Sequence, residues 1–374
     1  AAPVGTDADP VMLEVFNNLF MSIAEQMGVT LQNTASSVNI KERLDFSCAV
    51  FDASGALVAN APHMPVHLGS MDRSVESIIR QNPDMRPGDV YALNAPYNGG
   101  THLPDITVVT PVFDDDGKGI LFFVASRGHH ADVGGMAPGS ATPRATHVDE
   151  EGVLIDNFKL VDRGTLRDDA FIDLMTGHAW PARNPKQNLA DIVAQVAANE
   201  KGVAELRRMV GHFTLPVVQA YMKHVQDNAE ESVRRVIDRL ADCEATYPTD
   251  TGQQIRVRIS VDHDKREATV DFTGTSAMAK NNYNAPEPVA RGAGSVPGST
   301  TPMRAVSACS SPSSPLPRLR PGPGILYQRM RDGVALTQLW IPWSLQGQPS
   351  GALSPGVLVA CVCWAPSRLS FLCG

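Results

Sequence analysis

The centre of the chain holds two apolar runs, 106–113 and 120–126, separated by the short segment 114–119, which is rich in Asp and Gly. Apolar runs arranged in this way around a turn-forming segment predict a β-hairpin of two antiparallel strands. A hairpin constrains the fold strongly, because its register fixes which flanking residues are brought together. The residues just before the first strand and just after the second must meet at its open end.

Both flanking segments are rich in His, Asp and Gly. The first, 99–105, reads Gly-Gly-Thr-His-Leu-Pro-Asp, and the second, 126–135, reads Ser-Arg-Gly-His-His-Ala-Asp-Val-Gly-Gly. A turn at the middle of the connecting segment pairs residues whose numbers sum to about 233. Asp105 is therefore expected opposite Gly128.

These segments offer the ligand types of a metal site. Pro104 has no N–H for a strand ladder and bends the chain, which lets His102 and Asp105 converge. We predict that His102, Asp105 and His129 bind a divalent metal, and that Asp132 is a fourth ligand or orients one of the three. Imidazole combined with carboxylate suits Mn, Fe or Zn. The alternative is that these residues only cap the strand ends through hydrogen bonds.

Three further residues are candidates for catalysis. His67, together with His63 in the segment 62–69, is a candidate wall of the metal pocket or a general acid/base. His130 is a second candidate for moving protons. Arg127 is a candidate clamp for a substrate carboxylate, because a guanidinium binds a carboxylate through two parallel hydrogen bonds. The simpler interpretations are hydrogen bonds within a loop for the histidines and a local ion pair for Arg127.

The periodicity of the rest of the chain predicts a mixed α+β fold. Asp9 followed by Pro10 is a typical helix start, and apolar residues at helical spacing continue to about residue 32. Further helices are predicted at 69–80, 187–213 and 216–240, and further strands at 46–51, 56–59, 89–93, 254–261 and 267–272. Strands, then a long helical block, then strands favour an α+β architecture with antiparallel hairpins over alternating parallel units.

The composition changes abruptly near residue 292. Only one of the 40 acidic residues, Asp332, lies in 293–374, and none of the ten His does. This stretch is rich in Pro, Ser, Arg and Cys and shows no helix or strand period, so we expect its roughly 80 residues to be irregular. We predict one domain at 1–292, incomplete at its C-terminus, followed by an anomalous tail at 293–374. The tail is either a flexible extension or an out-of-frame translation, and its Trp, Cys and Leu content favours the second.

Composition also disfavours some classes of function. The formal net charge of -8, without a Lys/Arg cluster interleaved with aromatics, disfavours nucleic-acid binding. No apolar run approaches the roughly 18 residues of a membrane span, and no basic-then-apolar leader is present, so we expect no membrane association and a cytoplasmic location. The chain has no phosphate-loop motif, so nucleotide chemistry is expected on a partner. Small molecules and other proteins are the expected partners.

Several longer motifs resemble a known family. They are Asn-Ile-Lys-Glu-Arg-Leu-Asp-Phe-Ser-Cys-Ala at 39–49, Ala-Pro-His-Met-Pro-Val-His-Leu-Gly at 61–69, Gly-Thr-His-Leu-Pro-Asp at 100–105 and the His/Asp segment 125–135. Together they resemble the hydantoinase B/oxoprolinase family, and within it the C-terminal, B-type region of ATP-dependent 5-oxoprolinases. The resemblance continues through Asp-Phe-Thr-Gly-Thr at 271–275 and stops beyond Arg291.

The resemblance implies a division of labour between two portions. In this family an A-type ATPase portion uses ATP to phosphorylate a lactam or ketone oxygen, and the B-type portion carries the activated intermediate onward. For 5-oxoprolinases the overall reaction opens 5-oxoproline to glutamate with hydrolysis of ATP. A related acetone carboxylase subunit carries a metal at positions that match His102, Asp105 and His129. We therefore expect a cyclic amide hydrolase component that needs an A-type partner and forms an oligomer.

This interpretation gives each candidate residue a role. A divalent metal, Mn, Zn or Fe, at the three predicted ligands would activate water or polarise the carbon of the phosphorylated lactam. His67 or His130 would move protons, and Arg127 would hold the substrate carboxylate. Two alternatives stay open. The chain is otherwise a component of an N-methylhydantoinase or a ketone carboxylase, or a non-catalytic assembly subunit in which the His/Asp hairpin is structural.

Overall fold

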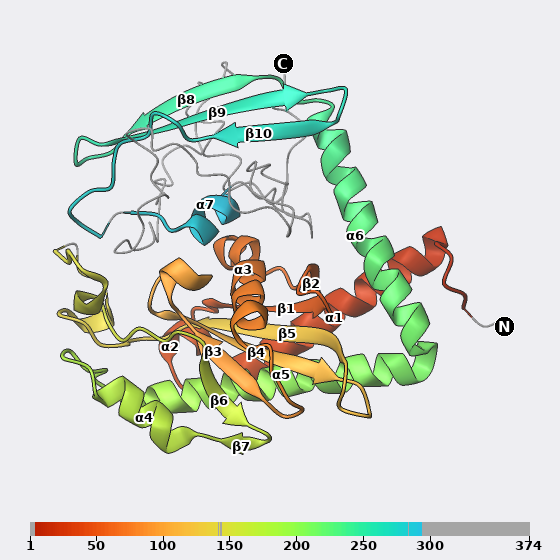
Figure 1. Ribbon diagram of the computed structural model, residues 1–374, viewed down its shortest axis with the longest axis horizontal. Helices are drawn as coiled ribbons and strands as arrows, with labels where there is room; N and C mark the ends of the chain where they lie inside the picture. Colours follow the sequence, from red (N-terminus) through yellow and green to blue (C-terminus); the bar gives the residue numbers. More distant parts are fainter. Residues whose placement is uncertain (1–3, 141, 143, 283, 294–374) are drawn as a thin grey trace.

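The computed structural model describes residues 4–293, except 141, 143 and 283. Within this range the fold is α+β with antiparallel sheets, which confirms the predicted fold class. All but the first residue of the predicted tail, 293–374, lies outside the described residues, so the proposed domain boundary stays a prediction. Figure 1 shows a large sheet with helices on both sides and a smaller sheet at some distance from it.

The large sheet has seven strands in the order β2-β1-β5-β4-β3-β6-β7, and every neighbouring pair is antiparallel. Its strands are β1 (Phe46–Asp52), β2 (Leu57–Asn60), β3 (Val90–Leu93), β4 (Asp105–Phe113), β5 (Ile120–His129), β6 (Phe158–Asp162) and β7 (Thr165–Leu166). The predicted hairpin, β4 and β5, lies at the centre of this sheet. Strand β4 is buried along its whole length, which requires cover on both faces.

Helices supply that cover (Figure 1). The α-helices among the described residues are α1 (Pro10–Thr34), α2 (Val38–Lys41), α3 (Pro65–Gln81), α4 (Asp168–Thr176), α5 (Pro185–Phe213), α6 (Leu215–Ile237) and α7 (Glu287–Ala293). Alternate residues of β5 belong to separate apolar clusters: Val124 packs with α1 and α5, whereas Ala125 packs with α3. Since successive strand residues point to opposite faces, α3 covers one face of the sheet and α1 with α5 the other.

Helix α1 begins and packs as its sequence predicts. The Asp9 carboxylate accepts the backbone N–H of Met12 at 2.8 Å, and Pro10 occupies the first turn, where its missing N–H costs nothing. Residues at intervals of three and four, Phe16, Phe20, Ile23, Met27 and Leu31, are buried against the sheet. The helix ends at Thr34, two residues beyond the predicted end.

Helix α5 uses polar as well as apolar residues on its buried face. Gln195 and Asn199 are fully buried, and their side-chain amides donate to the carbonyls of Ile106 at 2.9 Å and Val108 at 3.0 Å on β4. Val193, which the apolar periodicity places on the buried stripe, is 43 % exposed. Periodicity therefore predicts the helix correctly but misassigns part of its buried face, because buried amides satisfied by sheet carbonyls resemble surface residues in a sequence.

Helix α3 begins earlier than predicted. It starts at Pro65 rather than near residue 69, so His67 lies in its first helical turn and not in a constrained loop. Proline fits the first turn of a helix, since its fixed φ is already helical and its missing N–H needs no partner there. As a result the helix brings His67 to the end of the β4–β5 hairpin.

The register of the hairpin differs by one residue from the prediction. Close to the turn, Phe113 pairs with Ile120, as expected. A β-bulge then inserts one extra residue, so Asp105 lies opposite His129 rather than opposite Gly128. Directly opposed residues of an antiparallel pair point to the same face of the sheet. The bulge therefore places the Asp105 and His129 side chains together.

The smaller sheet follows α6 in the chain and lies at the C-terminal end of that helix (Figure 1). It consists of β8 (Cys243–Pro248), β9 (Gln254–Asp262) and β10 (Glu267–Asp271) in the order β10-β9-β8. The β9–β10 hairpin agrees with the sequence prediction, whereas β8, β6, β7, α2, α4 and α7 were not predicted. Strand β8 is mostly exposed, so it lacks the apolar alternation on which a strand prediction depends.

Candidate metal centre

The loop before β4 is held by close backbone packing at its Gly-Gly pair. Gly99 has φ of +94°, and a Cβ there would lie 2.4 Å from the carbonyl oxygen of Arg73 on α3. At Gly100 a Cβ would lie 2.2 Å from the carbonyl oxygen of Asn94. The Asn94 side chain in turn donates to the carbonyl of Leu103 at 2.8 Å. Only glycine fits both positions, and the loop that follows is fixed between α3 and the end of β3.

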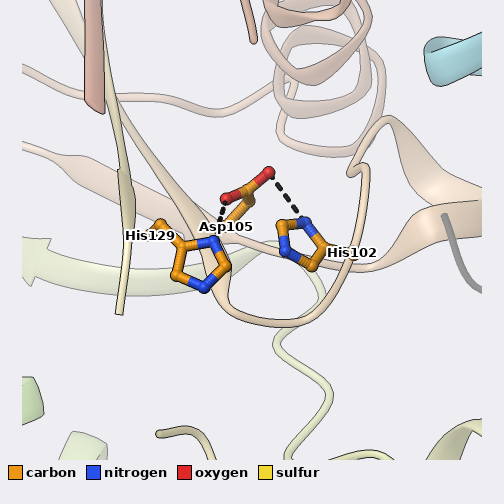
Figure 2. Close-up of side chains that lie close together, drawn as sticks. All are labelled: His102, Asp105 and His129. Atoms are coloured by element: carbon orange, nitrogen blue, oxygen red, sulfur yellow. Dashed lines mark ion pairs between the residues drawn. The ribbon is translucent and has the colours of Figure 1, made fainter. Parts of the chain in front are cut away.

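Three side chains converge where this loop joins the hairpin (Figure 2). Asp105 is the first residue of β4, His129 is the last residue of β5, and His102 comes from the loop. His102 Nδ1 lies 2.8 Å from Asp105 Oδ2, and His129 Nδ1 lies 3.2 Å from Asp105 Oδ1. The two imidazole rings are 4.9 Å apart between centroids. These three residues are the predicted metal ligands, and the fold brings all three together.

The electrostatics of the group favour a charged Asp105. Burial by itself raises the pKa of the Asp105 carboxyl, but the adjacent His102 and His67 imidazoles outweigh it and bring that pKa well below its usual range. Burial lowers the pKa of His102, in spite of the nearby carboxylate. Burial also acts to lower the pKa of His129, but its contact with Asp105 prevails and the pKa is raised. The carboxylate is thus the anionic centre of the group.

Several atoms of the group are left without hydrogen-bond partners. Both ring nitrogens of His102 and Oδ1 of Asp105 are buried and have no hydrogen bond, although they lie close to one another. One ligand atom from each of His102, Asp105 and His129 lies within 4.8 Å of the others. Buried polar atoms normally have partners, so donors and acceptors without hydrogen bonds at one point mark this group as a candidate metal site. Two imidazoles and a carboxylate fit a divalent ion such as Mn, Fe or Zn.

Two residues that the sequence analysis did not assign to the site lie beside it. Thr101 Oγ1 donates to Asp105 Oδ2 at 2.9 Å. The Asp45 carboxylate lies 3.7 Å from His129 Nδ1 and 3.8 Å from His67 Nε2. Thr101 belongs to the same short motif as two predicted ligands, His102 and Asp105. Its position next to them in the sequence could therefore have indicated that it lies at the site. Asp45 is placed by the pairing of β1 with β5, which no local pattern reveals.

His67 reaches the group from α3. Its Nε2 lies 3.2 Å from Asp105 Oδ2, and its Nδ1 lies 3.3 Å from the hydroxyl of Ser47. The expectation that His67 walls the ligand group is therefore in line with the geometry, and its role in proton transfer stays a prediction. His63 lies elsewhere: its Nδ1 accepts the backbone N–H of Cys48 at 3.1 Å, and burial lowers its pKa to about 4.

Arg127 has different contacts from those of a substrate clamp. Its side chain is fully buried, and it donates to the hydroxyls of Thr107 at 2.7 Å, Ser70 at 2.6 Å and Ser74 at 2.7 Å. It also donates to the carbonyl of His67 at 3.3 Å. These acceptors surround the guanidinium, and the predicted clamp for a substrate carboxylate stays a prediction. Arg127 fixes α3 to the face of the sheet.

Asp132 and His130 also lie outside the ligand group. Asp132 forms an ion pair with Arg183 at 2.7 Å. His130 is fully buried, with Nε2 3.0 Å from the side-chain oxygen of Gln195 on α5. Helix α5 covers the opposite face of the sheet from His67, which places His130 away from the ligands. The predicted roles, a fourth or orienting ligand for Asp132 and proton transfer for His130, stay predictions.

No helix among the described residues has the length and apolar character needed to cross a membrane.

Comparison with known proteins gives a family match over most of the described chain. The model of the family described as hydantoinase B/oxoprolinase matches residues 9–300. The chain is 46% identical over 307 residues to 5-oxoprolinase 1 of Arabidopsis thaliana, which covers 75% of this chain and 24% of that protein. It is 40% identical over 300 residues to 5-oxoprolinase of Saccharomyces cerevisiae, which covers 77% and 23% respectively. The chain therefore spans about a quarter of the length of these relatives.

Solved structures show the same fold at lower identity. An ATP-dependent caprolactamase from Pseudomonas jessenii matches with a TM-score of 0.66 and 23% identity, over 76% of this chain and 49% of that one. Acetone carboxylase, in a nucleotide-free structure, matches with a TM-score of 0.67 and 15% identity, over 76% and 40%. Given the family match over residues 9–300 and the 40–46% identity to these 5-oxoprolinases, the chain belongs to the hydantoinase B/oxoprolinase family.

Proposed function

We propose that the chain is the B-type component of an ATP-dependent 5-oxoprolinase, which hydrolyses the phosphorylated lactam of 5-oxoproline to glutamate. The observation that carries this proposal is the group formed by buried His102 and Asp105 and half-buried His129, in which several ligand atoms have no hydrogen bond. Relatives named 5-oxoprolinase support the substrate, and the caprolactamase supports lactam hydrolysis on this fold.

A division between two components is part of the proposal. The chain spans 22–24% of the length of its 5-oxoprolinase relatives, so most of such a protein has no counterpart here. We assign to an A-type partner the binding of ATP and the transfer of its γ-phosphoryl group to the lactam oxygen. Water then adds to the lactam carbon and the C–N bond breaks, and the ring nitrogen takes up a proton to become the free amine, which leaves an acyl phosphate. A second water displaces the phosphate from this acyl group, and glutamate results.

The residues of this chain have distinct tasks in that reaction. His102, Asp105 and His129 would hold a divalent ion, which supplies Lewis-acid polarisation and a water of lowered pKa. His67 lies against the Asp105 carboxylate and is the residue we assign to proton transfer, since His130 is enclosed on the α5 side. Arg127 holds α3, and through it His67, in place.

The test mixes the full chain with the A-type portion of a 5-oxoprolinase, 5-oxoproline and ATP, and measures glutamate. The His102→Ala variant is expected to lose at least about 100-fold in turnover, because a three-ligand site loses one ligand. His263→Ala is the matched control, since His263 is an exposed residue in the turn of the β9–β10 hairpin.

The same assay separates the alternatives. Turnover of N-methylhydantoin in place of 5-oxoproline, or bicarbonate-dependent turnover of acetone, would replace the proposed substrate by that of a related enzyme. Full turnover by His102→Ala in the complete mixture would instead identify a non-catalytic subunit with a structural His/Asp hairpin. Absence of glutamate with the wild-type chain would contradict the proposal directly.

A further inference from the structure

We propose that Thr101 is a positioning residue that holds the carboxylate of Asp105 in the orientation required for metal binding. This inference rests on the metal site of the proposed function. It concerns a residue that is not itself a ligand and that the sequence analysis did not assign to the site.

The two oxygens of Asp105 have different surroundings. Oδ2 accepts the hydroxyl of Thr101 at 2.9 Å, and His67 Nε2 lies 3.2 Å from the same oxygen. Oδ1 is buried and lies 3.2 Å from His129 Nδ1 without a hydrogen bond to it. His102 Nδ1 lies 2.8 Å from Oδ2, but the geometry is not that of a hydrogen bond. Thr101 is thus the hydrogen-bond donor that fixes the rotation of the carboxylate, and Oδ1 remains available for a metal.

The hydroxyl of Thr101 is the donor in this hydrogen bond, and the carboxylate oxygen of Asp105 is the acceptor. Hydrogen bonds to an ionised acceptor are stronger than those between neutral groups. Thr101 is 2 % exposed, so water has little access to replace the bond. Partners of this kind orient the ligands of metal sites and increase their affinity.

The loop that carries Thr101 is itself fixed. The hydroxyl of Ser74 on α3 donates to the carbonyl of Gly99 at 2.6 Å, and Ser74 receives a hydrogen bond from Arg127 at 2.7 Å. The N–H of Gly100 donates to the carbonyl of Ala95 at 2.8 Å. Thr101 follows directly after these anchored residues. The backbone of these anchored residues therefore fixes the position from which the Thr101 side chain reaches Asp105.

A pair of variants separates the hydroxyl from the shape of the side chain. Thr101→Val keeps the branched shape and removes the donor, whereas Thr101→Ser keeps the donor. Binding of Co²⁺ to the full chain is measured by titration calorimetry, and the visible absorption of the bound Co²⁺ reports on its ligand geometry. We expect Thr101→Val to bind Co²⁺ about 10–100-fold more weakly, with an altered spectrum, and Thr101→Ser to stay within about threefold of wild type.

Asp105→Asn separates the outcomes. If this variant abolishes Co²⁺ binding while Thr101→Val binds as tightly as wild type, Thr101 has no positioning role and only this inference fails. If Asp105→Asn binds Co²⁺ as wild type does, the metal site itself is absent and the proposed function fails with it. Far-UV circular dichroism and the urea midpoint check folding. Should Thr101→Val not fold, Thr101→Ala compared with Thr101→Ser gives the same measurement.

Discussion

At the scale of single residues, the chemistry of the site centres on one buried carboxylate. Asp105 is 2 % exposed, and its ionic contacts among the described residues are with the imidazoles of His67, His102 and His129. Burying a carboxylate in its charged form is costly unless donors or cations surround it. The imidazoles and the Thr101 hydroxyl surround the Asp105 carboxylate and offset this cost. A divalent cation bound at the same point would offset it further.

Glu151 shows the opposite situation, a buried acid for which no such partner is found among the described residues. Burial raises its pKa to about 8, so the folded protein keeps it protonated at pH values where the unfolded chain is ionised. Its contribution to stability is therefore complete at acid pH and is lost as the pH rises from about 4.5 to about 8. We expect Glu151→Gln to remove this loss, which makes the variant more stable than wild type at pH 9 by on the order of 2–3 kcal/mol.

Urea midpoints at pH 5, 7 and 9 check this prediction. Glu42→Gln, a change at an exposed glutamate, is the control and should leave the pH dependence of the wild type unchanged. Equal pH profiles for wild type and Glu151→Gln would show that Glu151 ionises in the folded protein without cost.

At the scale of elements, the site is the meeting point of a hairpin and a helix. The β4–β5 hairpin brings Asp105 and His129 together through its bulged register, and α3 delivers His67 to the same place. Arg127 joins the two, because its guanidinium contacts Thr107 on β4 as well as two serines and a carbonyl of α3. The position of α3 on the sheet thus depends on a buried cation as well as on apolar packing.

Replacing Arg127 by lysine should weaken the attachment of α3 to the sheet. A lysine keeps the charge but has no planar fork of donors, so it cannot reach the hydroxyls of Ser70, Ser74 and Thr107 together. We expect Arg127→Lys to lower the free energy of unfolding by about 2–4 kcal/mol, because buried hydrogen bonds to a charged group are lost. Urea denaturation measures this, with Arg239→Lys at an exposed site as control. An unfolding free energy equal to that of the control would mean that α3 does not depend on the guanidinium.

At the scale of the whole molecule, the described part holds a candidate metal centre, and the sequence holds no phosphate loop. A ligand that binds only the folded state stabilises it in proportion to the logarithm of its concentration over Kd. The two cofactors of the proposed reaction, metal and ATP, should therefore act differently on this chain when it is alone.

Thermal unfolding of the full chain distinguishes the two. A divalent metal such as Mn²⁺ or Zn²⁺ at about 100 times its Kd is expected to stabilise the chain by about 2.7 kcal/mol and to raise Tm by several degrees. Millimolar ATP without the A-type partner is expected to leave Tm unchanged. A rise in Tm with ATP alone would place nucleotide binding on this chain and contradict the proposed division. His129→Ala is the control for the metal effect, which it should abolish.

The sequence by itself determined that the three candidate ligands lie together, because they flank a single hairpin and a hairpin is a local structure. His102, Asp105 and His129 are separated by strands and a turn whose pattern is readable, so their meeting follows from pairing rules within one residue of register. The fold class, helix α1 and the β9–β10 hairpin were predictable for the same reason, since capping residues and apolar spacing act over short distances.

Tertiary structure decided the surroundings of those ligands. A bulge set the final register, the pairing of β1 with β5 brought in Asp45, and the docking of α3 brought in His67 and enclosed Arg127. Asp132 and His130, next to the ligands in sequence, were drawn to Arg183 and Gln195 instead. Such contacts join segments far apart in the chain, and their geometry follows from how helices and sheet pack together, which short-range patterns do not encode.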